Sequence, residues 1–463
     1  MSTAVVANVT FIDLSTYAEI EGHLYGGPEA VTIYVRAVQK SNWHSFVPIS
    51  LRLHSTPDFG AQKGSAHLNR SGDYVLSVWF RAQIPKIKYA AGVKADATLR
   101  WTNNLMHNLF SRIWITFNEL TVQEFDNYWL DFNYQFRLRG SKRVGYRNMI
   151  GDIAALTDEV TGEALLGNDG FFQCPFPFWF TEDTGNAHPA AALPFNEVRI
   201  NYDINKLTDL VICRPGVAGV GTAGSPALVV NALGGKPALV QPEVFAHYGV
   251  VHNDERVMMG DAPRDMLLSQ AQMVQVAPFK DVTSLTSFDI RLSHSIVAIF
   301  FAAQNKSVQA AGLGGEWSNY TTLSALYSGA SSASDPISTA TLRYESSPRF
   351  SMGADYFSMT APYYFSDAIP DETGYHMYTY STDAWNLDPL GSTNYSKLAN
   401  VSIEYNMSAA AIAASAGNVD GVAIDYSAVP NTVTRNQSFQ HVFEAKNWNI
   451  GRIANGSMGF PTL

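Results

Sequence analysis

Short apolar runs, separated by clusters of turn-forming residues, repeat along this sequence. The runs are rich in Val, Ile, Tyr, Phe and Trp, and the clusters between them in Gly, Pro, Asn, Asp and Ser. Strands are built from runs of this kind and turns from such clusters. Stretches with helical periodicity are scarce, and short helices are expected at residues 18–25 and 261–271, with Asp261 as cap and Pro263 in the first turn of the second. The pattern predicts an all-β protein made of sandwiches, not βαβ units.

Six runs stand out as predicted strands, at residues 31–38, 74–80, 113–117, 198–202, 290–301 and 401–405. Overlapping the fifth, residues 295–303 are apolar almost throughout. This run is far shorter than the ~20 residues that span a bilayer, so it is predicted to be a buried strand.

A faint internal repeat indicates a duplicated domain. Each half has an aromatic run, then an acidic pair with Thr-Gly, then a V-x-I-x-Y strand, at residues 175–180, 182–185 and 198–202 and again at 362–365, 371–374 and 401–405. Three other segments are predicted to be long loops, at 216–236, 305–341 and 408–427. The first lies near the middle of the chain, so we predict that it links the two halves.

Charge is sparse for a chain of 463 residues. Only 16% of residues are charged, against ~25% in a typical soluble domain, which indicates that much of the surface contacts other chains. The net charge, 31 − 41 = −10, argues against wholesale wrapping of nucleic acid, but leaves room for a local basic patch. The two cysteines, Cys174 and Cys213, are predicted to be buried thiols in a reducing compartment.

Patterns typical of catalysis are weak. The dinucleotide-like run at 219–224 is followed at once by Pro226 where a helix would be needed, so it is predicted to be a loop. The acidic pairs 182–183 and 371–372 resemble solvated turn residues more than the two carboxylates of a glycosidase. We therefore predict no catalytic residue, no metal site and no cofactor. Nine Asn-x-Ser/Thr sequons, among them those at Asn305 and Asn319, are expected to be incidental in the absence of a secretory signal.

One basic run follows the aromatic stretch 128–136. It contains five basic residues without an intervening acid: Arg137, Arg139, Lys142, Arg143 and Arg147. In a chain of charge −10 these favour contact with another protein, and we predict a protein-contact patch here. A solvated loop and a site for single-stranded nucleic acid are the alternatives.

Longer motifs, found nearly end to end, resemble those of one family. They read FIDLSTY at 11–17, LYGG at 24–27, NRSGDYVL at 69–76, LRWTNNLMHN at 99–108, TFNE at 116–119, RVGYRNMIG at 143–151, LPFNEVRI at 193–200, PLGSTNYSKLAN at 389–400 and NGSMGFP at 455–461. The chain is similar to the major capsid proteins of large icosahedral nucleocytoplasmic DNA viruses, especially those of iridoviruses and marseilleviruses. The three long loops do not share the resemblance.

This resemblance implies a double jelly roll, with two eight-stranded β-sandwich domains in one chain. The expected divisions are an N-terminal arm at 1–25, a first jelly roll at 26–215, a linker at 216–236 and a second jelly roll at 237–463. It further implies a pseudo-hexagonal homotrimeric capsomer in the virion capsid, assembled in the cytoplasm of the infected host cell. The implied partners are neighbouring capsomers, minor capsid and penton proteins and, through the arm, the internal viral membrane, with no specific nucleic acid.

Two other functions share parts of this sequence pattern. An aromatic-rich β-sandwich can bind carbohydrate or cleave glycosides, but it needs exposed aromatic platforms or facing carboxylates. The sequons suggest a secreted adhesin, whereas the missing signal and disulfide features argue against one.

Overall fold

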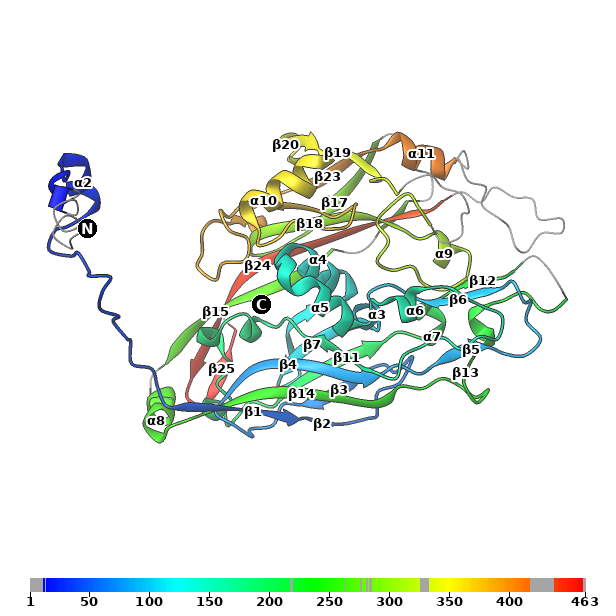
Figure 1. Ribbon diagram of the computed structural model, residues 1–463, viewed down its shortest axis with the longest axis horizontal. Coiled ribbons are helices and arrows are strands. Elements are labelled where there is room, and N and C mark those ends of the chain that lie inside the picture. The colour runs from blue at the N-terminus through cyan, green and yellow to red at the C-terminus, as the bar shows by residue number, and fades with distance from the viewer. Residues whose placement is uncertain are drawn as a thin grey trace, which may run out of the picture. The chain divides into compact units, whose positions relative to one another are not determined.

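The computed structural model describes residues 11–12, 14–216, 220–261, 263–274, 277–279, 282, 285–324, 333–416 and 437–460. The chain divides into two compact units, Met1–Trp43 and His44–Leu463. The second unit contains two β-sandwiches, each made of two antiparallel sheets (Figure 1).

The first sandwich spans residues 44–251. One sheet has the strand order β1-β14-β4-β10, from β1 (His44–Ser50), β4 (Tyr74–Gln83), β10 (Phe171–Pro175) and β14 (Val240–Val251). The other has the order β2-β3-β11-β7-β8, from β2 (Arg52–Leu53), β3 (Gly64–His67), β7 (Phe110–Phe117), β8 (Leu120–Phe125) and β11 (Val198–Ile204). Two small sheets extend it, built from β5 (Ile87–Tyr89), β6 (Thr98–Trp101), β9 (Val160–Thr161), β12 (Val211–Arg214) and β13 (Val229–Asn231).

The second sandwich begins at residue 264. Its first sheet has the order β15-β24-β18-β21, from β15 (Arg264–Met273), β18 (Ser295–Asn305), β21 (His376–Thr379) and β24 (Phe439–Ala454). The other has the order β17-β23-β19-β20, from β17 (Leu285–Ile290), β19 (Ile337–Tyr344), β20 (Ser347–Gly353) and β23 (Val401–Met407). The short strands β16 (Ala277–Phe279), β22 (Thr393–Asn394) and β25 (Ser457–Gly459) pair at the edges of the first sheet.

The strand orders of the two sandwiches match. With β2 and the short strands of the sheet edges and small sheets set aside, each sandwich has eight main strands. Counted along the chain, the first, eighth, third and sixth strands form one sheet, and the second, seventh, fourth and fifth form the facing sheet. This is the jelly-roll arrangement, in which the last strand returns beside the first. The matching order confirms the duplication, and β11 and β23, which carry the two V-x-I-x-Y motifs, occupy equivalent places. The other two parts of the repeat are not equivalent, because residues 175–185 follow the start of β10 whereas residues 362–374 precede its counterpart β21.

The expected division between the halves is wrong. Residues 216–236 precede β14, and β14 pairs with β1 and β4 of the first sandwich. A jelly roll is complete only once its last strand has returned, so the junction lies later, at helix α8 (Asn253–Asp261). The segment at 216–236 therefore belongs to the long connection between β12 and β14 within the first sandwich and contains β13. This connection has the same place in the strand order as the one between β23 and β24 in the second sandwich.

Most predicted strands are present, but two expectations fail. Residues 31–38 form no strand, because strands need a pairing partner and these residues are exposed throughout. Residues 264–273 form β15 instead of a helix, since they pair along their whole length with β24. Pro263 does not open a helix but follows the end of α8, as proline disfavours helix in the preceding residue. The expected helix at 18–25 is confirmed as α2 (Glu19–Leu24).

Helices fill the long connections. After β8 come α4 (Asn127–Arg137), α5 (Gly140–Ile150) and α6 (Ala154–Thr157), and after β20 come the π-helix η5 (Tyr356–Thr360) and α10 (Ala361–Phe365). Shorter helices are α3 (Leu105–Asn108), α7 (Leu207–Leu210), α9 (Ser307–Ala310) and α11 (Ala409–Ser415). In the described part of the chain, no helix is both long and apolar enough to cross a membrane.

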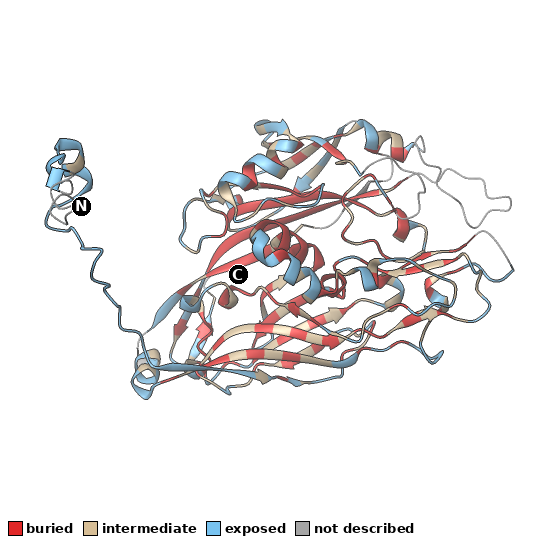
Figure 2. Cartoon of the chain, viewed as in Figure 1, coloured by how far each residue is buried: buried red, intermediate tan, exposed pale blue. Residues whose placement is uncertain are grey.

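Strand β18 lies between two hydrophobic cores, as its unbroken apolar run predicts. Ile299 and Phe301 face the core inside the second sandwich, whereas Ala298 and Phe300 belong to the core that begins in the first. Figure 2 shows β18 and β24 buried along most of their length. The connections at β5, β12, β13, α9 and α11 gather at one end of this unit, and α8 lies at the opposite end (Figure 1).

Candidate interaction surfaces

Helix α4 joins the two sandwiches. Its N-cap is Asp126, whose side chain accepts a hydrogen bond from the Trp129 amide. Phe132 and Trp129 then pack on Phe300 of β18, with ring centroids 5.9 and 5.7 Å away. The hydroxyl of Tyr128 donates to Gln304 Oε1 at 2.9 Å. The aromatic stretch at 128–136 is therefore helical and lies in the core between the two sandwiches. Asp126, as a residue type that caps helices, is the sequence signal that could have predicted this helix.

The predicted contact patch lies at the end of α4 and on α5, so these residues belong to helices and not to a loop. Arg143 is the most enclosed of the five, at 5% exposure. Its guanidinium donates to the carbonyls of Leu138 (3.0 Å), Gln135 (2.8 Å) and Ile369 (2.6 Å), and it forms an ion pair with Asp371. Two of these partners follow α10, so Arg143 ties the second sandwich to the first.

The other four basic residues differ in exposure. Arg137 lies 3.4 Å from Glu182 Oε1, and Arg147 lies 2.6 Å from Asp152 Oδ2. Arg139 pairs with Asp367 at 3.0 Å, but its side chain remains 76% exposed. Lys142 is exposed and has no ion-pair partner among the residues that the structure describes. Contact with another chain therefore stays a prediction, and the surface available for it is that of Arg139 and Lys142.

A cavity of about 630 Å³ opens beside these two residues. Its walls come from the sheet, through Ser77 and Pro175, and from the helices, through Tyr134, Arg139 and Lys142. Its rim is basic, and its walls are partly polar and partly aromatic.

The acidic pairs differ from the prediction at one residue. The Glu182 side chain is only 6% exposed, accepts a hydrogen bond from the Ser269 hydroxyl at 2.9 Å and lies 3.9 Å from Nζ of the buried Lys446. Burial lowers the pKa of Lys446. Glu182 therefore belongs to the joint between the sandwiches. The other three acids, Asp183, Asp371 and Glu372, are exposed, as predicted for turn residues, and Asp183 accepts from the Gly185 amide at 2.9 Å.

A closed polar network holds the helices together. His107 Nδ1 lies 2.8 Å from Asp131 Oδ1 and His107 Nε2 lies 2.8 Å from the Tyr146 hydroxyl. Ser318 of the second sandwich donates to Asp131 Oδ2 at 2.6 Å. The histidine and aspartate are fully buried, so this network positions α3, α4 and α5.

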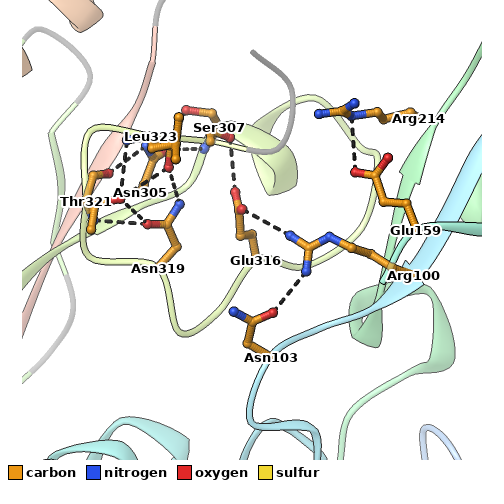
Figure 3. Close-up of polar contacts among 11 residues, drawn as sticks. Arg100, Asn103, Glu159, Arg214, Asn305, Ser307, Glu316, Asn319, Thr321 and Leu323 are labelled. Carbon is orange, nitrogen blue, oxygen red and sulfur yellow. Dashed lines mark hydrogen bonds and ion pairs between the residues drawn. The ribbon is translucent and has the colours of Figure 1, made fainter. Parts of the chain in front are cut away.

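Ion pairs and amides join the sandwiches again at the loop end (Figure 3). Arg100 lies 3.5 Å from Glu316 and donates to Asn103 at 3.0 Å. The sequon residue Asn305 is fully buried, and its amide donates to Thr321 O and Gln437 Oε1, so it is closed to glycosylation in the folded chain.

Features of metal or thiol chemistry are limited. The described residues contain no group of three or more His, Cys, Asp or Glu that could hold a metal ion. Cys174 and Cys213 are both buried free thiols, as predicted, and burial raises the pKa of each, to about 12 for Cys213.

Buried His188 makes stability depend on pH. It packs against the rings of Phe117 and Phe180, and burial lowers its pKa to about 4. Between pH 6.5 and 4 the unfolded chain binds more protons at this site, so stability falls as pH falls. At pH 4.5 the loss should be about 2–3 kcal/mol relative to pH 7.5. Denaturant titrations at both pH values should show that His188→Phe removes this loss, while buried His441, whose pKa burial lowers to about 3, contributes a loss of the same sign in both proteins. Parallel pH profiles would contradict the assignment.

The N-terminal unit exposes most of its large apolar side chains. Every described residue from 11 to 43 is exposed except Glu21, which is half-buried. The exposed set comprises Phe11, Ile12, Leu14, Tyr17, Ile20, Leu24, Tyr25, Val31, Ile33, Tyr34, Val35, Val38 and Trp43. So much apolar surface on one segment marks an interaction site.

Comparisons with known proteins agree with this architecture. The family model described as major capsid protein N-terminus matches residues 32–248, and the model for large eukaryotic DNA virus major capsid protein matches residues 255–459. The first match ends in β14 and the second begins within α8, so the two matches divide the chain where the sandwiches divide it.

Relatives match over the full length. The major capsid protein of Costelytra zealandica iridescent virus is 42% identical, covering 99% of both chains, and that of Invertebrate iridescent virus 3 is 43% identical, covering 100% of both. The Faustovirus major capsid protein, a double jelly roll, has a TM-score of 0.67 at 13% identity, covering 95% of this chain and 94% of its own. These comparisons lend no support to a carbohydrate-binding or glycoside-cleaving function. The chain folds as a double jelly roll and belongs to the major capsid proteins of large eukaryotic DNA viruses.

Proposed function

We propose that this chain forms a homotrimeric capsomer of pseudo-hexagonal outline, which tiles the icosahedral outer shell of a virion. The observation that carries the proposal is the duplication, because two sandwiches of one strand order stand side by side in each chain. Three such chains place six similar sandwiches around an axis, which suits a hexagonal lattice.

We infer a structural role without enzymatic activity. The polar clusters at the joints are closed by hydrogen bonds and ion pairs, and their residues hold the two sandwiches together. Assembly needs many modest interfaces, each weak alone and stable together.

The remaining parts of the proposal concern place and partners. The loop end of the sandwiches would face outward and the exposed N-terminal unit would contact minor capsid proteins, penton proteins or the internal viral membrane. The particle would be assembled in the cytoplasm of the infected cell.

Light scattering of the purified full-length protein, with negative-stain imaging of the same peak, tests the capsomer. We expect a mass of three chains and a hexagonal outline. A monomer at every concentration, with no assembly alongside the other shell proteins, would overturn the proposal.

A further inference from the structure

An aromatic strip crosses the outer face of the β1-β14-β4-β10 sheet. Trp79 on β4 packs on Phe245 and His247 of β14, with ring centroids 5.5 and 4.5 Å away. Their neighbours Val78 and Phe80 point into the core, so these three rings point away from it, and each is partly exposed. Polar residues usually cover the outer face of a sandwich sheet, so this strip marks a contact surface.

A second apolar surface lies on the helix formed by η5 and α10. Phe357 and Ala361 anchor this helix in the second sandwich. On its other side Met359 is 63% exposed, and Tyr363 and Tyr364 are each 67% exposed. Aromatic residues and methionine exposed together are typical of protein interfaces.

Within one chain, a helix of the first sandwich already packs on the outer sheet face of the second sandwich. Helix α4 follows β8 in the first sandwich, at the place where η5 and α10 follow β20 in the second. Within the chain, α4 covers the outer face of the β15-β24-β18-β21 sheet, where Phe132 and Trp129 pack on Phe300. The corresponding face of the first sandwich is the outer face of the β1-β14-β4-β10 sheet, which carries the aromatic strip. The helix of the second sandwich that corresponds to α4 is the one formed by η5 and α10.

Charge supports the same pairing. Asp355 is exposed just before η5, four residues before Met359 and eight before Tyr363. Lys142 and Arg139 rim the cavity beside the aromatic strip. An acidic end of the helix can thus meet a basic rim when the aromatic side chains meet the strip.

We propose that the η5–α10 helix of one copy packs on the aromatic strip of the next copy, at Trp79, Phe245 and His247. The contact is head-to-tail, because it joins two different surfaces, and repeating it three times closes a ring. It rests on the proposed trimer. Three contacts of this kind between chains then alternate with the three that α4 makes within chains.

Two full-length variants test the contact by light scattering. The helix variant carries Tyr363→Asp and Tyr364→Asp, and the strip variant carries Trp79→Asp. Each alone should be monomeric, and their mixture should contain one-to-one dimers, since one intact helix then meets one intact strip. Phe195→Asp, at an aromatic residue of similar exposure (73%), is the control and should remain trimeric.

Cross-linking provides a second readout should a single contact dissociate or Trp79→Asp fail to fold. A chain with both Tyr363→Cys and His247→Cys, treated with a short bis-maleimide, should yield covalent trimers, whereas either cysteine alone should not. If both charge variants remained trimeric and the double-cysteine chain gave no covalent trimers, this contact would be excluded, whereas the trimer itself would stand. A monomeric wild-type protein would instead count against the trimer itself.

Discussion

Replacing Arg143 with Glu should lower the free energy of unfolding by about 3–5 kcal/mol, because each buried acceptor left without its donor costs about 1–3 kcal/mol and Arg143 serves three carbonyl groups. Arg143 is almost fully buried, and its guanidinium serves three carbonyl groups as well as Asp371. Glutamate would leave those carbonyls without a donor and place a second carboxylate beside Asp371. Chemical denaturation followed by tryptophan fluorescence measures the loss.

The matched control is Arg139→Glu, four residues earlier. Arg139 pairs with Asp367, but its side chain is 76% exposed. Exposed ion pairs contribute about 0–1 kcal/mol, so this variant should unfold almost like the wild-type protein. It should weaken contacts between chains instead, if the basic rim of the cavity faces a neighbour. Equal losses of stability in the two variants would show that burial does not separate their roles.

Deletion of residues 2–40 should abolish shell formation and leave the trimer intact. The described residues of this segment bury no large side chain, so its removal should not change the melting temperature of the sandwiches. Its exposed apolar side chains need a partner in the particle, because patches of this size are otherwise aggregation sites. Light scattering checks the trimer, and electron microscopy of co-expressed shell proteins checks assembly.

A variant of full length separates the chemistry of this segment from its length. Changing Val31, Ile33 and Val35 to Ser removes apolar surface in the run that the sequence predicted to be a strand. If residues 31–38 form a strand by pairing with another protein, this variant should assemble as poorly as the deletion. Normal shells from the truncated chain would refute an assembly role for the N-terminal unit.

The sequence was informative wherever a strand reads locally. Along β4, β11 and β23, and along part of β7, buried residues alternate with more accessible ones, and this period of two is visible in the sequence of each strand alone. Strand β18 was equally plain, since its unbroken apolar run matches a strand with a core on each face. The V-x-I-x-Y repeat likewise indicated a duplication that the strand orders then confirmed.

Local sequence patterns do not show which distant residues pair. Residues 31–38 have the composition of a strand but lack a partner, whereas 264–273 resemble a helix and become a strand because β24 pairs with them. The boundary between the sandwiches was misplaced for the same reason. The return of β14 to β1 joins residues about 200 positions apart, and nothing in the composition of 216–236 reports it.

The candidate patch shows the same division at the level of single side chains. The run of Arg137, Arg139, Lys142, Arg143 and Arg147 indicated a basic contact region, but not which charges are already neutralised. Local periodicity and composition act over a few residues and so establish the strands, the duplication and the basic run. Burial and ion pairing are properties of surfaces that meet only after folding. The tertiary structure alone therefore separates the buried Arg143, which joins the two sandwiches, from Arg139 and Lys142, whose side chains stay exposed.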